Sequence, residues 1–475
     1  MQKNTEPVKK GAAEVGIIGL AAMGANLARN FSGKGVKTAV YNRTANKTET
    51  FIKEFGPAAG ENLSGAKTLE ELIENLAKPR VIILLVKAGD AVDEILHELS
   101  PLLTKGDIVM DMGNSPYQDT QRRSKEMDKK GLNFWGCGIS GGEEGALNGP
   151  SLMPGGSKES WKTVQPLLEK VAAPDFSKKP CVTYAGPDGA GHFVKTVHNG
   201  IEYGIIQLMA EAYDLLGSLF NMPAPDVAQV FEGYSRGKLN GFLFELGAKV
   251  LKKKNDKGDG FLVDKIQDKA AQKGTGMWAT QEALKLGVAI PTIAEAVFAR
   301  AISADAEKRA HAEKIYSVKV KRQNLDLDKF VDMLDDALYA AIIITFNQGF
   351  DLLWEGSETH KWNINPSEIA RIWQGGCIIR MKLLKKIESD FRTKPAVPEL
   401  ADDLKANTPN LGKIVSLAAE NGVPVAALAS AYSYFLNSSR ARGPMNLIQG
   451  LRDAFGAHTY ERTDRSGTFH SNWNN

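Results

Sequence analysis

The sequence has little of what would place it in several large classes of protein. Only three of its 475 residues are cysteine, Cys137, Cys181 and Cys377, and they are far apart with no CxxC spacing. Neither a disulfide framework nor a zinc site is therefore expected. The 59 basic and 56 acidic residues leave a formal charge of +3, which gives no field that would draw the whole protein to nucleic acid. Any anion-binding site must be local.

Long apolar runs are also missing. The longest, near residues 338–346 (LYAAIIITF), is far too short to cross a bilayer, and residues 1–14 lack the apolar core of a signal peptide. Together with the scarcity of cysteine, these absences favour a cytoplasmic protein with no membrane partner. Because the first fourteen residues are polar and contain a proline and a glycine, we expect a flexible N-terminal extension over residues 1–14.

Short apolar runs alternate with amphipathic stretches between Val15 and about Thr183. A chain of this length predicts two or three domains, and this alternation is typical of βαβ units with a mostly parallel sheet. The expected strands are VGIIGL, KTAVY, RVIILLV, DIVMDM, LNFWG, SLMPGG and CVTY, and the expected helices include TLEELIENLAK and DAVDEILHELSPLL. The sequence thus predicts an α/β domain over residues 15–188.

Strand-like runs nearly vanish after Pro187. Between Pro187 and Pro223 the pattern predicts one helix of roughly seven or more turns, which is long enough to be the spine of a domain. We therefore predict a large all-α domain over residues 189–440. From about Arg440 the helical period fades into a polar sequence with several glycines, which we expect to form a short C-terminal tail over residues 441–475.

A glycine-rich turn follows the first expected strand and opens a helix. In such a turn, backbone N–H groups and the helix N-terminus point at a pyrophosphate, as in Rossmann-like dinucleotide-binding domains. Ala21 stands where the usual fingerprint has its middle glycine, so the backbone approaches phosphate slightly less closely. A tight turn with no ligand is the alternative. The residues of this expected cofactor site are Gly19, Leu20, Ala21, Ala22, Met23 and Gly24.

The end of the second strand favours NADP over NAD. An NAD-binding protein usually has an acidic residue there to hold the ribose 2′-hydroxyl, but this chain has Asn42, Arg43 and Thr44. An arginine can bind a 2′-phosphate with two hydrogen bonds, and Thr44 can add a third, whereas a carboxylate would repel it. The alternative is that Arg43 only caps a surface turn.

The most informative segment is GAGHFVKTVHNGIEYG at residues 189–204. Lys195, His198, Asn199 and Glu202 lie at i, i+3, i+4 and i+7, so one face of the expected helix carries all four. Lys195 and Glu202 would be separated by about 10 Å along the helix axis, and could address opposite ends of a small substrate. A lysine becomes a usable base when burial or nearby cations lower its pKa.

A solvent-facing polar stripe on an amphipathic helix is the alternative. Two features argue against it. The stripe mixes residue types instead of repeating Glu and Lys, and four glycines should bring neighbouring backbone close to this helix although each interior glycine costs about 1 kcal/mol of helix stability. Those glycines are Gly189, Gly191, Gly200 and Gly204.

Several long motifs resemble those of 6-phosphogluconate dehydrogenases. They are GISGGEEGALNGPSLMPGG at 138–156, HFVKTVHNGIEYG at 192–204, DMGNSPYQDT at 111–120, LLVKAG at 84–89, QKGTG at 272–276, AVFAR at 296–300, GGCIIR at 375–380 and FGAHTYER at 455–462. The resemblance runs from about residue 15 to residue 475. It implies NADP-dependent oxidative decarboxylation of 6-phospho-D-gluconate to D-ribulose 5-phosphate and CO2, in gluconate utilisation and the pentose phosphate pathway.

The resemblance also implies roles for individual residues. Lys195 would be the general base that takes the sugar hydroxyl proton, and Glu202 the acid that protonates the enediol after CO2 leaves. The carboxylate and hydroxyls would be held by Asn114, Ser140, Gly141, Gly142, His198 and Asn199, and the phosphate by Tyr203, Lys273, Arg300, Arg452 and His458. Further cofactor contacts would come from Val86, Lys87, Ala88 and Asn114. The resemblance further implies a homodimer in which the tail of one subunit reaches the partner's site, and a reaction that requires no metal.

Three residues depart from the family pattern. Met112 stands where the family usually has glycine, Met277 where it has lysine, and Leu147 replaces a more polar residue. Met277 removes a positive charge near the phosphate end. Two other functions stay open on the sequence. A dehydrogenase of an unphosphorylated β-hydroxyacid would share the cofactor turn and the lysine but would not need the cluster of phosphate-binding cations. An inactive NADP-binding regulatory protein would not need Lys195 and Glu202.

Overall fold

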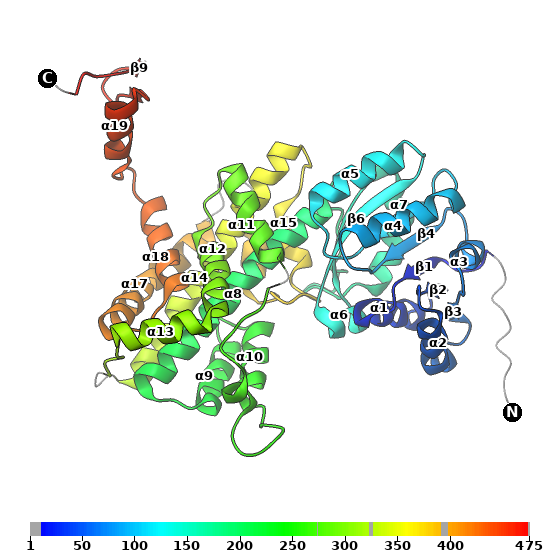
Figure 1. The fold of residues 1–475 in the computed structure, drawn as a ribbon, viewed down its shortest axis with the longest axis horizontal. Coiled ribbons are helices and arrows are strands. Elements are labelled where there is room, and N and C mark those ends of the chain that lie inside the picture. Colours follow the sequence, from blue (N-terminus) through cyan, green and yellow to red (C-terminus); the bar gives the residue numbers. More distant parts are fainter. Residues whose placement is uncertain (1–10, 273, 323–325, 391–397, 474–475) are drawn as a thin grey trace.

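The computed structural model describes residues 11–272, 274–322, 326–390 and 398–473. An N-terminal α/β part lies beside a large helical part, and the last helix stands off the helical part at the end far from the sheet (Figure 1). The predicted fold class, a Rossmann-like domain with a mostly parallel sheet followed by a large helical region, is confirmed.

The α/β part is built on a seven-stranded sheet in the order β3-β2-β1-β4-β5-β6-β7. The first six strands run parallel, and β7 is antiparallel to β6. The strands are β1 (Val15–Ile18), β2 (Thr38–Tyr41), β3 (Leu63–Gly65), β4 (Val81–Leu84), β5 (Ile108–Asp111), β6 (Asn133–Ser140) and β7 (Ser151–Gly155).

Helices cover both faces of this sheet because successive strand residues point to opposite sides. Val15 and Ile17 of β1 join an apolar cluster with α1, α2 and α7, whereas Ile18 joins a second cluster with α3, α4 and α5. The bounds are α1 (Ala22–Gly33), α2 (Ala45–Ala59), α3 (Leu69–Asn75), α4 (Asp90–Leu99), α5 (Tyr117–Asp128), α6 (Gly142–Asn148) and α7 (Lys158–Val171). Burial of both faces explains why the strands read as continuous apolar runs.

Two details of the sheet differ from the sequence prediction. The run CVTY does not form a strand: Val182 makes only an isolated bridge with Leu152, because its N–H bonds back to the carbonyl of Pro180 and no regular ladder develops. The short edge strand β3 was not predicted. Of the extension expected over 1–14, residues 1–10 lie outside the described residues, and the buried Ala13 is already hydrogen-bonded to Asn75.

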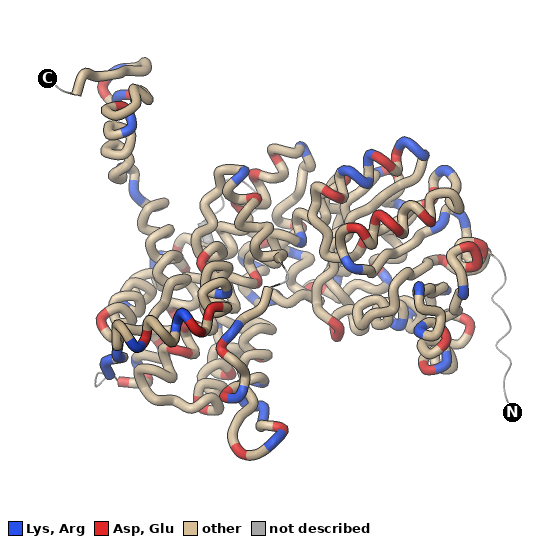
Figure 2. The backbone as a smooth tube through the Cα atoms, viewed as in Figure 1, with Lys and Arg blue, Asp and Glu red and all other residues tan. Residues whose placement is uncertain are grey.

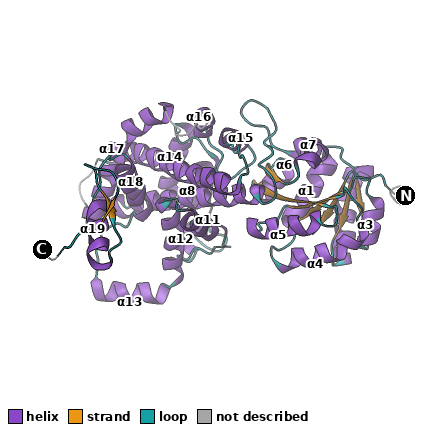
Figure 3. Ribbon diagram, turned by 90° about the horizontal axis from the view of Figure 1, so that it is seen from above, coloured by secondary structure: helices purple, strands orange, loops and turns teal. Residues whose placement is uncertain are grey.

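The helical part is organised around two long helices that lie side by side, α8 (Ala190–Phe220) and α14 (Leu327–His360) (Figure 3). The single long helix predicted between Pro187 and Pro223 is therefore confirmed. The other helices are α9 (Ala224–Arg236), α10 (Phe242–Lys252), α11 (Thr275–Leu286), α12 (Pro291–Ala304), α13 (Ala306–Tyr316), α15 (Pro366–Ile372), α16 (Leu383–Asp390), α17 (Pro398–Asn421), α18 (Ala426–Ser438) and α19 (Met445–Gly456).

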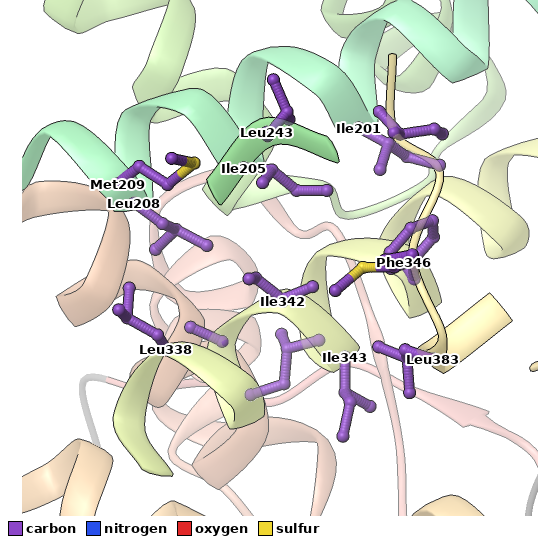
Figure 4. Close-up of a cluster of buried hydrophobic side chains, with 14 of the residues drawn as sticks. Ile201, Ile205, Leu208, Met209, Leu243, Leu338, Ile342, Ile343, Phe346 and Leu383 are labelled. Atoms are coloured by element: carbon purple, nitrogen blue, oxygen red, sulfur yellow. The ribbon is translucent and has the colours of Figure 1, made fainter. Parts of the chain in front are cut away.

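The core of the helical part lies between α8 and α14. Ile201, Ile205 and Leu208 of α8 face Ile342 and Phe346 of α14 (Figure 4), and all five side chains are buried. Charged residues are spread over the outer surfaces of both parts with the two signs mixed (Figure 2). Among the described residues, no helix is both long and apolar enough to cross a membrane.

The C-terminal tail is more ordered than the sequence suggests. The fading period after Arg440 predicts an irregular tail, but the structure has α19 there, followed by a small hairpin of β8 (Tyr460–Glu461) and β9 (Thr468–Phe469). The buried carboxylate of Asp453 organises this unit, because it accepts hydrogen bonds from the backbone of Thr459 and the indole of Trp473. The helical spacing of apolar residues is hard to recognise when the helix is short and is surrounded by glycines and polar residues.

Candidate functional site

The glycine-rich turn lies between β1 and α1, as predicted. Gly19 has a φ of 101°, and a Cβ at this position would lie 2.4 Å from the carbonyl oxygen of Leu85. At Gly24 a Cβ would lie 1.9 Å from the carbonyl oxygen of Gly19. Both glycines are therefore required by the backbone, while Ala21 and Ala22 at the start of α1 are exposed. The turn presents free backbone at a helix N-terminus, which fits the pyrophosphate of a dinucleotide.

The end of β2 lies next to this turn. Asn42 connects the two, because its Oδ1 accepts a hydrogen bond from the backbone N–H of Leu20 at 3.1 Å. Arg43 and Thr44 are exposed, and Thr44 precedes α2 without a capping hydrogen bond from its side chain. The Arg43 guanidinium is thus available to an anion beside the turn, which fits the 2′-phosphate of NADP.

Two further loops begin where neighbouring parallel strands end. The loop after β4 carries the half-buried Val86 and Ala88 with the exposed Lys87, and the loop after β5 carries the exposed Asn114. The carboxyl ends of β1, β4 and β5 meet at one edge of the sheet, where ligands of such folds bind. The residues predicted from the cofactor turn and from these two loops are therefore placed along a single edge.

The predicted polar face of α8 meets the end of β6. Lys195, His198 and Asn199 are buried, and Glu202 is partly exposed. The Nε2 of His198 is hydrogen-bonded to the hydroxyl of Ser140 at 3.0 Å. On the other side of the ring, Nδ1 lies 3.4 Å from the Lys195 ammonium nitrogen, 3.2 Å from Asn199 Oδ1 and 3.7 Å from Glu202 Oε2. The histidine therefore connects Ser140 to the other three side chains.

Burial shifts the protonation of this cluster towards neutral forms. The pKa of Lys195 is lowered by burial, although the nearby carboxylate of Glu202 partly opposes the shift. The pKa of Glu202 is raised by burial, with Lys195 and Arg300 opposing. His198 is fully buried, and burial together with the charge of Lys195 holds its pKa well below the usual range. A lysine that gives up its proton easily and a carboxyl that keeps one are suited to act as base and acid.

Glycines allow α8 to approach the sheet closely. A Cβ at Gly191 would lie 2.2 Å from the carbonyl oxygen of Gly136 in β6, and a Cβ at Gly189 would lie 2.7 Å from that of Tyr117. The prediction that neighbouring backbone approaches the helix is therefore confirmed at these two positions. At Gly200 and Gly204 the nearest atoms are instead in the side chains of Ala279 and Thr345, at 2.9 and 2.7 Å from the position of a Cβ.

Gly141 and Gly142 begin α6 directly after Ser140. Gly141 has a φ of 109° and its Cβ would lie 2.6 Å from the carbonyl oxygen of Gly376, so only glycine fits. The backbone N–H of Ile378 donates to the Ser140 hydroxyl at 3.4 Å. The segment 375–380 of the helical part thus supports the Ser140 turn, a contact that the sequence indicated only through the motif GGCIIR.

A cationic group from α12 lies against Tyr203, the residue that follows Glu202 in α8. The Arg300 guanidinium, from α12, lies 3.4 Å from the centre of the Tyr203 ring. Its Nη1 is buried and has no hydrogen-bond partner among the described residues, and burial lowers the pKa of the guanidinium. A buried guanidinium nitrogen with no partner is costly unless an anion occupies the site. The Tyr203 ring also packs on α11, where a Cβ at Gly276 would lie 2.3 Å from it.

The structure does not bring together all the predicted phosphate ligands. Lys273 lies outside the described residues. Arg452 and His458 are exposed on α19 and just after it, and α19 projects away from the helical part that contains α12 and its Arg300 (Figure 1). Of the three departures from the family pattern, Met112 is buried in the core, Leu147 is half-buried and Met277 is partly exposed on α11.

Two family models cover nearly the whole chain. Residues 14–186 match the NAD binding domain of 6-phosphogluconate dehydrogenase, and residues 191–473 match the 6-phosphogluconate dehydrogenase C-terminal domain. In the described part of the chain, no cluster of three or more His, Cys, Asp or Glu side chains is placed to hold a metal ion.

Curated proteins and solved structures show the same similarity. The chain is 45% identical over 467 residues to the NADP(+)-dependent, decarboxylating 6-phosphogluconate dehydrogenase of Bacillus subtilis, covering 97% of this chain and 99% of that protein. It is 44% identical over 469 residues to the decarboxylating 6-phosphogluconate dehydrogenase of Escherichia coli, covering 97% and 99%. A Plasmodium falciparum 6-phosphogluconate dehydrogenase, solved as apoenzyme, with NADP+ and with 6-phosphogluconate, superposes with a TM-score of 0.92 at 42% identity, covering 97% and 100%.

Proposed function

Because the chain belongs to the 6-phosphogluconate dehydrogenase family, we propose that it converts 6-phospho-D-gluconate to D-ribulose 5-phosphate and CO2 while reducing NADP+. The observation that carries this proposal is the cluster on α8, where a buried lysine of lowered pKa and a carboxyl of raised pKa both lie close to Nδ1 of His198. That arrangement supplies the two proton transfers that oxidation followed by decarboxylation requires.

NADP+ supplies the hydride acceptor for this reaction. We propose that its pyrophosphate binds at the turn of Gly19–Gly24, that its 2′-phosphate is held by Asn42, Arg43 and Thr44, and that its nicotinamide end lies near Val86–Ala88 and Asn114. Support comes from the exposed backbone of the turn and the exposed guanidinium beside it.

Lys195 and Glu202 divide the chemistry between them. Neutral Lys195 takes the proton of the substrate hydroxyl as hydride leaves the same carbon, which gives a 3-keto acid. The protonated Lys195 then donates its proton to the ketone oxygen as the electrons of the carbon–carboxylate bond flow into the carbonyl, so that CO2 departs and an enediol forms. Glu202, kept protonated by burial, donates a proton to the carbon of this enediol while Lys195 takes back the hydroxyl proton, which gives the ketone product.

The remaining polar groups hold the substrate between these two residues. His198 and Ser140, hydrogen-bonded to each other, face the carboxylate and hydroxyls. In this proposal the carboxylate and hydroxyl ligands are Asn114, Ser140, Gly141, Gly142, His198 and Asn199, and the phosphate ligands are Tyr203, Lys273, Arg300, Arg452 and His458. The unpartnered Nη1 of Arg300 supports the phosphate end.

We also propose a homodimer in which the tail of one subunit completes the site of its partner. The projecting α19 exposes apolar side chains at Met445, Leu447, Ile448, Leu451 and Phe455. A contiguous apolar face of this kind usually marks a binding surface. The three unpaired, buried cysteines support a reducing, cytoplasmic location, and the reaction fits the oxidative pentose phosphate pathway.

The proposed function is tested by following the formation of reduced cofactor as absorbance at 340 nm, with each cofactor combined in turn with each substrate. We expect reduction of NADP+ with 6-phosphogluconate, much weaker reduction of NAD+, and stoichiometric release of CO2. Activity on an unphosphorylated β-hydroxyacid with none on 6-phosphogluconate would contradict the substrate assignment. The absence of turnover with any pair, despite tight NADP+ binding, would instead favour a regulatory NADP-binding protein.

Arg43→Asp should weaken NADP+ binding far more than NAD+ binding. Loss of a charge-assisted contact with the 2′-phosphate should weaken NADP+ binding by about 10-fold or more, while NAD+ binding, which involves no such phosphate, changes little. Calorimetric titration of both cofactors measures the ratio. Lys53→Asp makes the same charge change at an exposed position in the following helix, α2, and it should leave the ratio unaltered. Equal losses for both cofactors in Arg43→Asp would contradict the assignment.

Glu202→Gln should slow the last proton transfer and leave oxidation partly intact. In the wild type this step should slow as the pH rises through the raised pKa of Glu202, because the carboxyl must be protonated to act as the acid. In the variant that dependence should disappear. A 3-keto analogue that bypasses oxidation allows CO2 release and solvent proton uptake to be followed separately. Proton uptake with an unchanged rate and stereochemistry would rule out Glu202 as the acid.

A further inference from the structure

Arg123, in α5, has a guanidinium that is completely buried. Its side chain has no exposed surface, and a buried charge is stable only where it is well paired. Its Nε and Nη2 donate to the two carboxylate oxygens of Asp93 at 2.8 Å each, and its Nη1 lies 3.8 Å from the carboxylate of Asp111, which is also fully buried. The guanidinium of Arg123 holds the pKa of Asp93 below its usual range even though burial opposes the shift.

The partners of Arg123 lie in or next to both loops on the nicotinamide side of the proposed cofactor site. Its Nη2 also donates to the carbonyl of Gly89 at 3.0 Å. Gly89 is the last residue of the loop that carries Val86–Ala88. Asp93 lies in α4, directly after that loop. One fully buried side chain is thus bonded to the end of the β4–α4 loop and to the helix that follows it.

Asp111 provides the connection to the second loop. Its Oδ1 accepts the backbone N–H of Gly113 at 2.9 Å, and its Oδ2 accepts the hydroxyl of Ser115 at 2.6 Å. These two bonds fix the backbone on either side of Asn114. The two loops also lie close together: a Cβ placed on Gly113 would lie 3.2 Å from the carbonyl oxygen of Val86.

We propose that Arg123 is a positioning residue that sets the spacing between the β4–α4 loop and the β5–α5 loop, and so places the nicotinamide end of the cofactor against the substrate. The inference rests on the proposed function, because it assigns the nicotinamide end to these loops. The planar fork of arginine suits the task, since it bonds a carboxylate and a carbonyl in fixed directions at once. Lysine keeps the charge but cannot reproduce that geometry.

The neighbouring Arg122 is a matched control. It donates to the same Asp93 carboxylate at 3.0 Å, but its side chain is 45% exposed and its other ionic partners, Asp119 and Glu126, lie on its own helix. Arg122 therefore makes the same kind of ion pair without bonding to either loop. Arg122→Lys tests the pair with Asp93, whereas Arg123→Lys tests the connection between the loops.

The test compares ligands that reach the loops with one that does not. NADP+ extends to the nicotinamide end, whereas 2′,5′-ADP occupies only the adenosine end at the glycine-rich turn. In Arg123→Lys we expect kcat/KM for NADP+ to fall on the order of 10-fold, since a displacement of about 1 Å can cost 10²-fold in rate. The isotope effect on kcat with substrate deuterated at the oxidised carbon should rise, and the Kd of 2′,5′-ADP should not change. Arg122→Lys should match the wild type in all three measurements.

Ser115→Ala is a second, milder variant, because it removes only the hydroxyl that Asp111 holds. It should shift the same parameters in the same direction by a smaller factor. It also tests the proposal if Arg123→Lys fails to fold. Wild-type kinetics in either variant with only a lower melting temperature would overturn the proposal, as would equal weakening of NADP+ and 2′,5′-ADP. If the wild type turns over no 6-phosphogluconate, the proposed function fails, but titration still decides the role of Arg123, because in Arg123→Lys the Kd of NADP+ should rise while that of 2′,5′-ADP stays unchanged.

Discussion

Replacing Lys195 with methionine should abolish oxidation of 6-phosphogluconate while NADP+ still binds. Hydride cannot leave the substrate carbon unless the hydroxyl proton leaves with it, and we expect the loss of the base to lower kcat by about 10²- to 10⁴-fold. Single-turnover measurement of NADPH formation reports the oxidation step directly. A 3-keto analogue should also lose CO2 more slowly, because no ammonium polarises its ketone. Rapid oxidation of the normal substrate by this variant would show that Lys195 is not the base.

The same variant should be more stable than the wild type at neutral pH. The pKa of Lys195 is lowered by folding, so the unfolded chain holds this proton more tightly and protonation favours unfolding. This destabilisation is complete below the folded pKa and is lost as the pH rises to the unfolded value. Methionine has a similar shape and no charge, so the substitution should raise the free energy of unfolding by about 1 kcal/mol at pH 7. The gain should shrink towards pH 10, and thermal melting at the two pH values measures it.

The sequence predicts best what depends on local spacing. The glycine turn after β1 and the helical face of Lys195 and Glu202 are local patterns, and the structure has both the turn and the long helix. The pattern at the end of β2, where Arg43 stands in place of the usual acidic residue, is also local and can be read from the sequence. The steric requirement for glycine in this turn is also readable from the fingerprint, because Gly19 and Gly24 both have neighbours that leave no room for a side chain.

Contacts between distant segments could not be predicted in this way. Arg123 reads as one more charge on an amphipathic helix, and nothing in its spacing indicates that Asp93 and Asp111 surround it. The run CVTY has the composition of a strand, but the backbone of Val182 bonds to its own turn and not to the sheet. The helix α19 is short and rich in exposed apolar residues, so its stability depends on the small unit formed around Asp453.

The placement of Arg452 and His458 requires a second subunit if they bind the same phosphate as Arg300. In the single chain these residues lie on a projecting unit (Figure 1), and the apolar side chains of α19 are exposed. Because Asp453 binds the backbone and side chains of the hairpin, the unit can keep its shape when it docks on another chain. The tail would then deliver its two cations to the partner's site.

Truncation after Gly443 should therefore abolish activity on 6-phosphogluconate and leave NADP+ binding largely intact. The truncated chain keeps Lys195, Glu202 and the whole cofactor turn, so only the phosphate end of the site is lost. Arg462→Gln, which removes a tail arginine paired with Asp464, should retain activity and serves as the control for a charge change in the tail. Normal affinity of the truncated protein for 6-phosphogluconate would contradict a role of the tail in substrate binding.

Coexpression of the truncated chain with full-length Lys195→Met decides which subunit the tail serves. Each protein is expected to be inactive alone. In a mixed dimer, the truncated subunit provides Lys195 and its Lys195→Met partner provides the tail, so one complete site forms and activity returns. If the tail served its own subunit, neither chain would contain a complete site and the mixed dimer would stay inactive. Differently tagged subunits allow the mixed dimer to be purified, and its NADP+ reduction distinguishes the two arrangements.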